Sequence, residues 1–341
     1  MKVLVTGGTG YIGTHTVLSL LNSDHEVIVY DNLSNSSYES ITRVQKLTGK
    51  SVDFVEGDIQ DKAKLDSVFS QYKPSAVIHF AALKAVGEST QIPLNYYQNN
   101  VFGSLCLLEV MAEHQVSNFI FSSSATVYGE ENPSPYLETM KLGTPASPYG
   151  ATKVMIERIM QDIAVADTDF RGVALRYFNP IGAHESGQIG EDPKGVPNNL
   201  LPYIAQVAVG KREKLSVFGD DYPTNDGSCE RDYLHVMDLA EGHVAALNWL
   251  INNPDFRGVE AFNLGTGVGT SVFAIIEAFE QATGQKISYE VSPRREGDLP
   301  AFWASAQKAE LKLNWRANRS LLQMMEDTWR WQSANPNGYN D

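Results

Sequence analysis

The sequence predicts an α/β protein in which a doubly wound parallel sheet is followed by a smaller mixed α/β region. Through the first half of the 341 residues, short β-branched runs alternate with stretches of helical periodicity. A glycine-rich turn, GGTGYIG at 7–13, follows the first run, and a Gly-, Pro- and polar-rich segment at 180–200 ends the alternation. Alternation at this rhythm is typical of βαβ units, which place ligands outside the carboxyl ends of the strands.

The first half supplies the elements of this sheet. The β-branched runs predict strands at Val3–Thr6, Glu26–Tyr30, Val52–Glu56, Ala76–Phe80, Asn118–Ser122 and Gly172–Tyr177. Apolar residues at helical spacing predict helices that include Tyr11–Leu21, Ala63–Gln71, Asn99–His114 and Tyr149–Ala166. Right-handed crossovers would then put helices on both faces of the sheet.

The segment after Asn179 is expected to leave the sheet, because its glycines and prolines interrupt both periodicities. The expected elements beyond it are Leu201–Val209, Leu215–Phe218, a strand leading to a helix within Asp232–Leu250, Val272–Thr283, Ile287–Val291 and Leu321–Trp331. The run Ala261–Leu264 could rejoin the main sheet. We expect a first domain at 1–180, to which parts of 231–265 return, and a second at 181–341.

Composition excludes several classes of protein. A net charge of −14 disfavours nucleic acid and anionic membrane as general partners, so an anionic ligand would need a local cluster of cations. Two distant cysteines suggest neither a disulfide framework nor a zinc site, and we expect no metal. The chain enters a strand at once, and no apolar run approaches the length of a membrane span. These observations favour a cytoplasmic protein.

The turn at 7–13 matches a phosphate-binding loop. Gly7 suits a tight turn, Gly10 lets backbone approach a pyrophosphate at a helix N-terminus, and Gly13 lets helix and strand pack closely. Asp31 ends the second strand, where a carboxylate accepts hydrogen bonds from ribose hydroxyls and repels a 2′-phosphate. The combination predicts a Rossmann fold that binds NAD in preference to NADP; the alternative is that Asp31 only caps a turn.

Two later strand ends carry further candidate cofactor contacts. Asp58 follows the third strand and could reach the adenine amino group, although an Asx turn would use the same residue equally well. Lys84 follows the fourth strand and could approach phosphate, but its spacing alone favours a solvated lysine.

The fifth strand and the helix after it carry candidate acid–base chemistry. Three serines in FSSSATVYG, 121–129, lie at a carboxyl edge, and at least one is expected to face ligand. In SPYGATK, Ser147 is an expected N-cap, which puts Tyr149 in the first turn and Lys153 one turn later. An ammonium and a bound nicotinium ring would lower the pKa of Tyr149 toward neutrality. Alone, the Tyr-x-x-x-Lys spacing could arise by chance.

Together these motifs resemble the extended short-chain dehydrogenase/reductase family. Longer segments are similar to its branch of NAD-dependent nucleotide-sugar 4-epimerases across nearly the whole chain. They are VIHFAALKAVGES, NFIFSSSATVYG, LRYFNPIGAH, GEDPKGVPNNLLPYIAQVAVG, RDYLHVMDLA and PRREGDLPAFW. The resemblance implies reversible epimerisation of UDP-glucose and UDP-galactose at C4 through a 4-keto sugar, with tightly bound NAD returning the hydride.

The resemblance also assigns residues. It implies Tyr149 as acid and base, Lys153 as the group that tunes it, and Ser124 as a partner of the sugar hydroxyl. The implied NAD-binding residues are Gly7, Gly10, Tyr11, Ile12, Gly13, Asp31, Asn32, Asn35, Asp58, Ile59, Phe80, Lys84, Asn99, Ser122, Tyr149, Lys153, Tyr177 and Phe178. The implied substrate-binding residues are Ser124, Thr126, Tyr149, Phe178, Asn179, Asn199, Leu200, Phe218, Arg231, Tyr233, Arg295, Asp298 and Phe302. For Arg231 and Arg295, surface ion pairing is the alternative.

Three further expectations follow. A bulky Phe302 should disfavour N-acetylated hexoses. A dehydratase of the same fold would need a carboxylate after the serines, where Ala125, Thr126 and Val127 stand. A dehydrogenase using free NAD is less excluded, because the same tyrosine and lysine would serve it. The intact set of Ser124, Tyr149 and Lys153 argues against an inactive NAD-sensing protein. The helices at 99–114 and 149–166 are expected to form a homodimer interface, as in family members, or else simply to cover the sheet.

Overall fold

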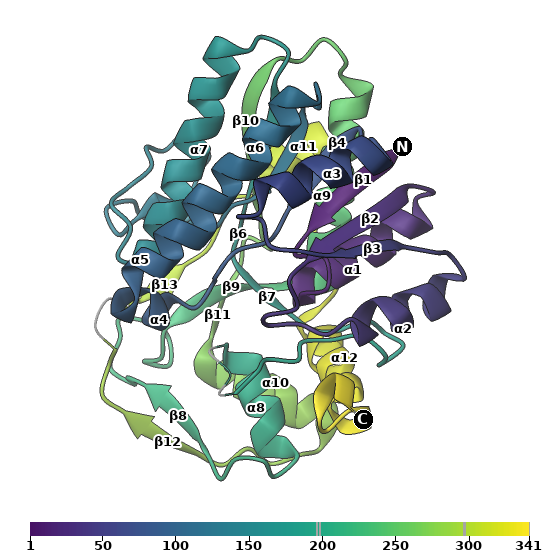
Figure 1. Ribbon diagram of the computed structural model, residues 1–341. Helices are drawn as coiled ribbons and strands as arrows, with labels where there is room; N and C mark the ends of the chain where they lie inside the picture. Colours follow the sequence, from purple (N-terminus) through teal and green to yellow (C-terminus); the bar gives the residue numbers. More distant parts are fainter. Residues whose placement is uncertain (196, 198, 296–297, 341) are drawn as a thin grey trace.

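Seven parallel strands form the main sheet of the computed structural model, which describes residues 1–195, 197, 199–295 and 298–340. The strand order is β10-β6-β5-β4-β1-β2-β3 (Figure 1). The strands are β1 (Lys2–Thr6), β2 (Glu26–Asp31), β3 (Asp53–Glu56), β4 (Ala76–His79), β5 (Asn118–Ser122), β6 (Arg171–Tyr177) and β10 (Gly258–Leu264). Each neighbouring pair is parallel, so the predicted doubly wound sheet is confirmed.

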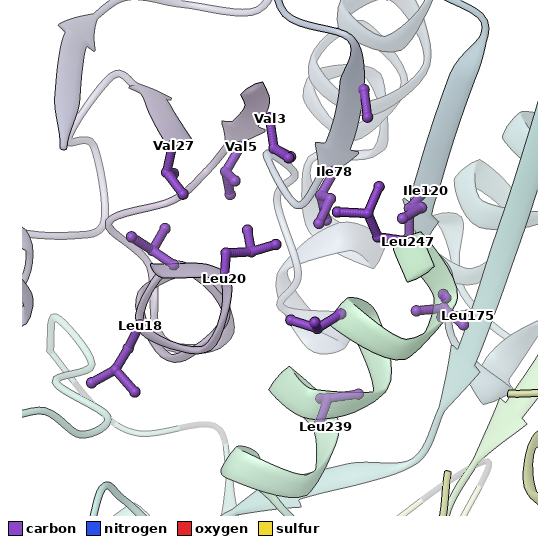
Figure 2. Close-up of a cluster of buried hydrophobic side chains, with 14 of the residues drawn as sticks. Val3, Val5, Leu18, Leu20, Val27, Ile78, Ile120, Leu175, Leu239 and Leu247 are labelled. Carbon is purple, nitrogen blue, oxygen red and sulfur yellow. The ribbon is translucent and has the colours of Figure 1, made fainter. Parts of the chain in front are cut away.

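Helices cover both faces of this sheet, because alternate strand residues point to opposite sides. One face carries α1 (Tyr11–Asn22), α2 (Glu39–Thr48), α9 (Val236–Asn252) and α11 (Gln307–Leu313), and the other carries α3 (Lys62–Tyr72), α6 (Gly103–Glu113) and α7 (Pro148–Ala166). Val3 and Val5 of β1 belong to the core of the first face and Leu4 to the core of the second. In Figure 2, Leu20 of α1 and Leu247 of α9 meet strand side chains of the first face.

The strand order reverses beside β1, with β2 and β3 on one side and β4, β5, β6 and β10 on the other. In open α/β sheets the ligand crevice lies outside the carboxyl ends at such a point. The glycine-rich turn follows β1 and the serine run follows β5, so the topology brings both motifs to this edge.

A smaller lobe faces that edge (Figure 1). It contains α8 (Leu200–Ala208), β8 (Leu215–Phe218), α10 (Val272–Thr283), β12 (Tyr289–Ser292) and α12 (Leu321–Ala334), and β8 pairs with β12 in parallel. Ile204, Phe279 and Met325 are fully buried in a core separate from those of the main sheet. The lobe is therefore held together by its own hydrophobic burial.

The chain passes between the two lobes repeatedly. After β6, β7 (Asn179–Ile181) pairs with β9 (Glu230–His235), which also pairs with β11 (Gly269–Ser271) and β13 (Ala301–Phe302). From β9 the chain continues through α9 into β10, so the run at 261–264 lies in the main sheet beside β6.

Hydrogen bonds also join residues of the first two strand–turn segments of the main sheet to the segment that follows β7. The hydroxyl of Tyr11 donates to the carbonyl of Gly182 at 2.6 Å. Lys194 Nζ donates to the carbonyls of Leu33 and Ser34 at 3.1 and 2.9 Å.

The expected strands and helices are all present, with ends shifted by a few residues. The helix expected at Asn99–His114 begins as a π-helical segment, η1 (Tyr97–Phe102), and continues as α6. The structure adds short elements whose periodicity is too brief to read, among them α4 (Val86–Gln91) and α5 (Pro93–Tyr96). Residues 196 and 198 of the expected excursion lie outside the described residues. Within the part of the chain that is described, no helix has the length and apolar character needed to cross a membrane.

Candidate active site

A cavity of about 950 Å³ opens between the carboxyl ends of the main sheet and the smaller lobe. The predicted site residues that line it are Gly7, Gly10, Tyr11, Ile12, Gly13, Asp31, Asn32, Asn35, Ile59, Phe80, Lys84, Asn99, Ser122, Ser124, Tyr149, Lys153, Tyr177, Phe178, Asn179, Asn199, Leu200 and Tyr233. The others, which lie outside this lining, are Asp58, Thr126, Phe218, Arg231, Arg295, Asp298 and Phe302. The volume is at the upper end of the range for small-molecule sites and suits a long ligand.

The glycine turn has the close packing that the sequence predicts. Gly7 has φ +69°, and a Cβ there would stand 2.7 Å from the backbone nitrogen of Ala81. A Cβ on Gly13 would stand 2.2 Å from the carbonyl oxygen of Gly7. Gly10 precedes α1, lines the cavity and has no side chain to cap the helix, so the first N–H groups of α1 can serve a phosphate. The turn therefore fits the pyrophosphate of a dinucleotide.

Asp31 is held beside this turn by two backbone donors and one serine hydroxyl. Its Oδ2 accepts from Thr9 N at 3.1 Å, and its Oδ1 accepts from Leu33 N at 2.9 Å and Ser36 Oγ at 3.2 Å. A carboxylate offers about four acceptor sites, so capacity remains for a ribose hydroxyl. Asp31 thus both braces its loop and stays open to a ligand.

Asp58 has a supporting position. Its Oδ1 accepts from Gln60 N at 2.9 Å, which is the Asx turn left open as the alternative, and its Oδ2 accepts from Asn32 Nδ2 at 2.9 Å. In this arrangement Asp58 orients Asn32, which lines the cavity.

Lys84 is half-exposed and pairs with Glu191 at 3.3 Å. Asn199 Nδ2 donates to the same Glu191 oxygen at 2.9 Å. Sequence reasoning missed Glu191, because it lies in the irregular excursion and depends on partners far away in the chain. Its carboxylate links two residues that the resemblance assigns to different ligands.

The start of α7 is built as expected. Ser147 Oγ accepts from Gly150 N at 3.2 Å, and Pro148 occupies the first turn, which puts Tyr149 and Lys153 on the cavity wall. Lys153 Nζ donates to the carbonyl of Ser122 at 2.7 Å and lies 5.7 Å from the centroid of the Tyr149 ring.

The side chains of the three serines point in different directions. Ser122 and Ser124 line the cavity, and the Ser122 hydroxyl is bonded to that of Tyr177. Thr126 Oγ1 donates to Ser124 Oγ at 3.0 Å, so Thr126 orients Ser124 from outside the lining. Ser123 instead donates to the buried Glu157 at 2.6 Å. The expectation that at least one serine faces the ligand site is consistent with this geometry.

The protein groups alone do not lower the pKa of Tyr149, contrary to the expectation from the sequence. Burial raises the pKa of Tyr149, and a hydrogen bond with Ser124 opposes the rise. Burial lowers the pKa of Lys153 to about 7, opposed by the charge of Glu157. Two reasons explain the difference. The expectation included the positive charge of a nicotinium ring, which only a bound cofactor supplies. In addition, Lys153 donates its hydrogen bond to the carbonyl of Ser122 rather than to the phenol.

Four of the predicted nucleotide-sugar residues that lie outside the lining contact one another: Phe218, Arg231, Arg295 and Asp298. Arg231 Nη2 lies 3.3 Å from Asp298 Oδ1, and Arg295 Nε lies 3.0 Å from Asp298 Oδ2. Arg295 also stacks over the ring of Phe218 at 5.0 Å. The ion pairing left open as the alternative is therefore present for both arginines, and two guanidinium groups sharing one carboxylate keep a local excess of positive charge.

Phe302 packs against two aromatic rings. Its centroid lies 4.9 Å from that of Tyr136 and 5.0 Å from that of Phe178, which lines the cavity. Phe302 therefore supports the wall from behind, and its bulk fixes where Phe178 can lie.

Comparison with known proteins agrees with this geometry. A sequence model of the GDP-mannose 4,6 dehydratase family matches residues 4–328. The UDP-glucose 4-epimerase of Erwinia amylovora is 61% identical over 99% of both chains. The crystal structure of the Bifidobacterium longum UDP-glucose 4-epimerase with NAD+ and UDP is 50% identical, with a TM-score of 0.95 over 99% of this chain and 100% of that one. The Stenotrophomonas maltophila enzyme, with NAD and formylated UDP-arabinopyranose, is 45% identical with a TM-score of 0.95 over 98% and 99%.

Proposed function

The chain belongs to the GDP-mannose 4,6 dehydratase family and, through its full-length relatives, to the UDP-glucose 4-epimerases, and we propose how its residues perform that reaction. The reaction is the reversible epimerisation of UDP-glucose and UDP-galactose at C4 through a transient 4-keto sugar. NAD is the cofactor. When bound, it accepts a hydride from C4 and later returns it to the opposite face of the same carbon.

The residues on the main-sheet side of the cavity hold this cofactor. The first N–H groups of α1 receive its pyrophosphate, and Asp31 accepts hydrogen bonds from a ribose. We assign this role to residues 1–180 with the returning strand β10, and the nucleotide-sugar role to residues 181–341. The close approach of Ala81 to Gly7 lets the two strand ends form one continuous floor.

Tyr149 moves the proton. As a phenolate, its oxygen takes the proton from the sugar 4-hydroxyl during oxidation and returns it to the sugar oxygen during reduction. Ser124 holds that hydroxyl, and the Lys153 ammonium favours the phenolate over the phenol. Burial raises the pKa of Tyr149, so the positive charge of a bound nicotinamide would supply the lowering, and the proton affinity of Tyr149 would rise again once that charge is lost.

The uridine diphosphate carries the binding energy. Arg231 and Arg295 offer fixed cations to its pyrophosphate, Asn199 and Leu200 meet it from the smaller lobe, and Asn179 meets it from β7. With the nucleotide gripped, the 4-keto hexose turns about its link to the diphosphate and presents its other face. Specificity for the nucleotide and mobility of the sugar are therefore assigned to different residues.

The observation that carries this proposal is the meeting of Ser124, Tyr149 and Lys153 in one cavity with the glycine turn. Purification without added cofactor, followed by a UDP-galactose to UDP-glucose assay, tests it. We expect turnover without added NAD and release of stoichiometric dinucleotide on denaturation. A requirement for free NAD, with accumulation of NADH, would instead identify a dehydrogenase.

We further propose a homodimer in the cytoplasm that serves galactose metabolism. Leu94, Phe102 and Leu105, on α5, η1 and α6, are exposed, as are Met155 and Val165 on α7. These apolar side chains suit a second copy of the same face. The two cysteines are free, as a reducing compartment favours. Light scattering of the purified protein would test the dimer, and a charged substitution at Leu94 should weaken it.

A further inference from the structure

A buried ionic network lies directly behind the catalytic wall, among residues outside the cavity lining. Arg176 of β6 donates from Nε and Nη2 to the two carboxylate oxygens of Glu157 at 3.0 and 2.6 Å. Ser123 Oγ donates to Glu157 Oε1 at 2.6 Å, and Arg176 Nη1 donates to the hydroxyl of Tyr128 at 3.1 Å. Only 5% of the Arg176 side chain and 2% of the Glu157 side chain are exposed.

Such a pair is not explained by stability alone. Desolvating two charges costs several kcal/mol, and well-packed apolar residues often serve a core equally well. The network instead adjoins the catalytic lysine. Glu157 follows Lys153 by one turn of α7, so the two side chains project from the same face.

Helix α7 thereby holds the serine turn, Ser122–Ser124, at two consecutive points. Lys153 Nζ donates to the carbonyl of Ser122, and Glu157 accepts from the hydroxyl of Ser123. Ser124, the next residue, faces the cavity beside Tyr149. A displacement of Glu157 would therefore move the carbonyl that receives Lys153 and the hydroxyl that serves the substrate.

The charges around Lys153 favour the same conclusion. Burial lowers the pKa of Lys153 to about 7, and Glu157 is the charge that opposes this fall. His79 of β4 faces Lys153 but stays neutral, because burial lowers its pKa to about 3. The other nearby titratable groups are Tyr149, Tyr96 of α5 with its bonded Glu88, Tyr177 of β6 and Tyr128 beside Arg176.

We infer that Glu157, with Arg176 as its counter-ion, is a positioning residue that keeps Lys153 an ammonium and holds the serine turn against the catalytic tyrosine. This role deepens the proposed function and depends on it. The network acts from outside the cavity, touching neither sugar nor cofactor, and works through the charge it presents to Lys153 and the hydrogen bond it presents to Ser123.

Opposite charge changes at the two ends of the pair test this role. Glu157→Gln keeps the shape and removes the negative charge, so the pKa values of Lys153 and Tyr149 should fall. Arg176→Gln leaves the carboxylate uncompensated, so both pKa values should rise. We expect the profile of kcat/KM against pH to move about one unit lower in the first variant and about one unit higher in the second. Arg158→Gln, an exposed charge change on the same helix, is the matched control and should move nothing.

The spectroscopic form of the experiment does not depend on turnover. Titration of the Tyr149 phenolate absorbance in the purified holoprotein, with a Tyr149→Phe baseline subtracted, should show the same opposite shifts. Shifts of Glu157→Gln and Arg176→Gln in one direction, or no shift in either, would overturn the inference, because simple loosening of the core cannot produce opposite signs. If Arg176→Gln fails to fold, the neutral double variant should fall between the parent and Glu157→Gln. A double variant that matches or exceeds Glu157→Gln also overturns the inference.

Two more measurements separate geometry from charge. Ser123→Ala should lower kcat without moving the pH profile, whereas Glu157→Asp should restore most of the parental profile. Suppose that the parent epimerises without added NAD, but Ser123→Ala and Glu157→Asp do not separate an effect on kcat from an effect on the pH profile. That result would refute the role of Glu157 and leave the proposed function standing. A parent without that activity would refute the proposed function, and the phenolate titration would still decide the role of Glu157.

Discussion

Arginine and carboxylate groups meet in two clusters outside the cavity lining, one behind the proposed catalytic residues and one among the proposed nucleotide-binding residues, in different proportions. In the first cluster, one guanidinium, that of Arg176, is matched to one carboxylate, that of Glu157, and both are buried. In the second cluster, Arg231 and Arg295 share Asp298, and more than half of the Arg295 side chain is exposed. A balanced buried pair fixes geometry, whereas two arginines that share one carboxylate keep positive charge available for an anion. The two clusters should therefore respond differently to substitution.

Removing the catalytic phenol should have the largest effect. Tyr149→Phe should lower kcat by about 10³-fold, because proton transfer from the sugar hydroxyl loses its acceptor. The affinity for UDP, measured by calorimetry, should stay within a few-fold of the parent. Near-parental turnover in this variant would contradict the comparison and favour an NAD-sensing protein whose tyrosine has no chemical role.

Changing the second cluster should affect binding instead. Arg231→Met should weaken UDP binding by about 10- to 100-fold, the cost of a lost charged hydrogen bond, with kcat changed much less. Arg231→Lys should recover only part of the affinity, because an ammonium lacks the guanidinium fork. Arg257→Met, at an exposed arginine paired with Asp169, provides the control. Equal losses from Arg231→Met and Arg257→Met would show that only net charge matters.

Three buried histidines should make the large lobe sensitive to acid. Burial lowers the pKa of His15 and His79 to about 3 and that of His243 to about 4. Since these values lie below the unfolded value of about 6.5, the unfolded state binds protons first and stability falls as the pH drops from about 6.5. Each histidine should remove about 2 kcal/mol by pH 5. Denaturant midpoints at pH 7 and 5 measure the loss, and His243→Gln should reduce it; an unchanged loss would contradict this account.

The smallest expected effect concerns the aromatic wall. Phe302→Ala should raise turnover of UDP-N-acetylglucosamine relative to UDP-glucose by about tenfold, because it frees space behind Phe178. Parallel assays of both substrates measure the ratio. Rapid turnover of the N-acetylated sugar by the parent would show that Phe302 does not limit the pocket.

The cofactor side of the fold was largely predictable from the sequence. Gly7, Gly10, Gly13 and Asp31 belong to contiguous strand–turn–helix patterns, whose geometry follows from local rules. The cap at Ser147 likewise located Tyr149 and Lys153 in one step. In these cases sequence neighbours are also spatial neighbours.

Residues whose partners are distant in the chain were not predictable. Glu191 meets Lys84, and Ser123 turns away from the cavity toward Glu157, because of tertiary contacts that no periodicity reports. The burial that raises the pKa of Tyr149 in the protein alone, and the hydrogen bond that Lys153 gives to Ser122, also depend on such contacts. Local patterns identified the candidate residues, whereas their hydrogen-bond partners and burial depend on tertiary packing.

The repeated passage of the chain between the lobes has a mechanical consequence. A domain joined to its neighbour by one linker can rotate freely about that linker. Here β7, β9 and the path through α9 to β10 cross the boundary between the lobes. Hydrogen bonds from Tyr11 and Lys194 also cross it. Opening wide would require several strands to bend and several bonds to break together. A dinucleotide in such a clamp exchanges slowly with the surrounding pool. It therefore stays bound through successive turnovers, and its oxidation state is protected from other redox reactions between one substrate molecule and the next.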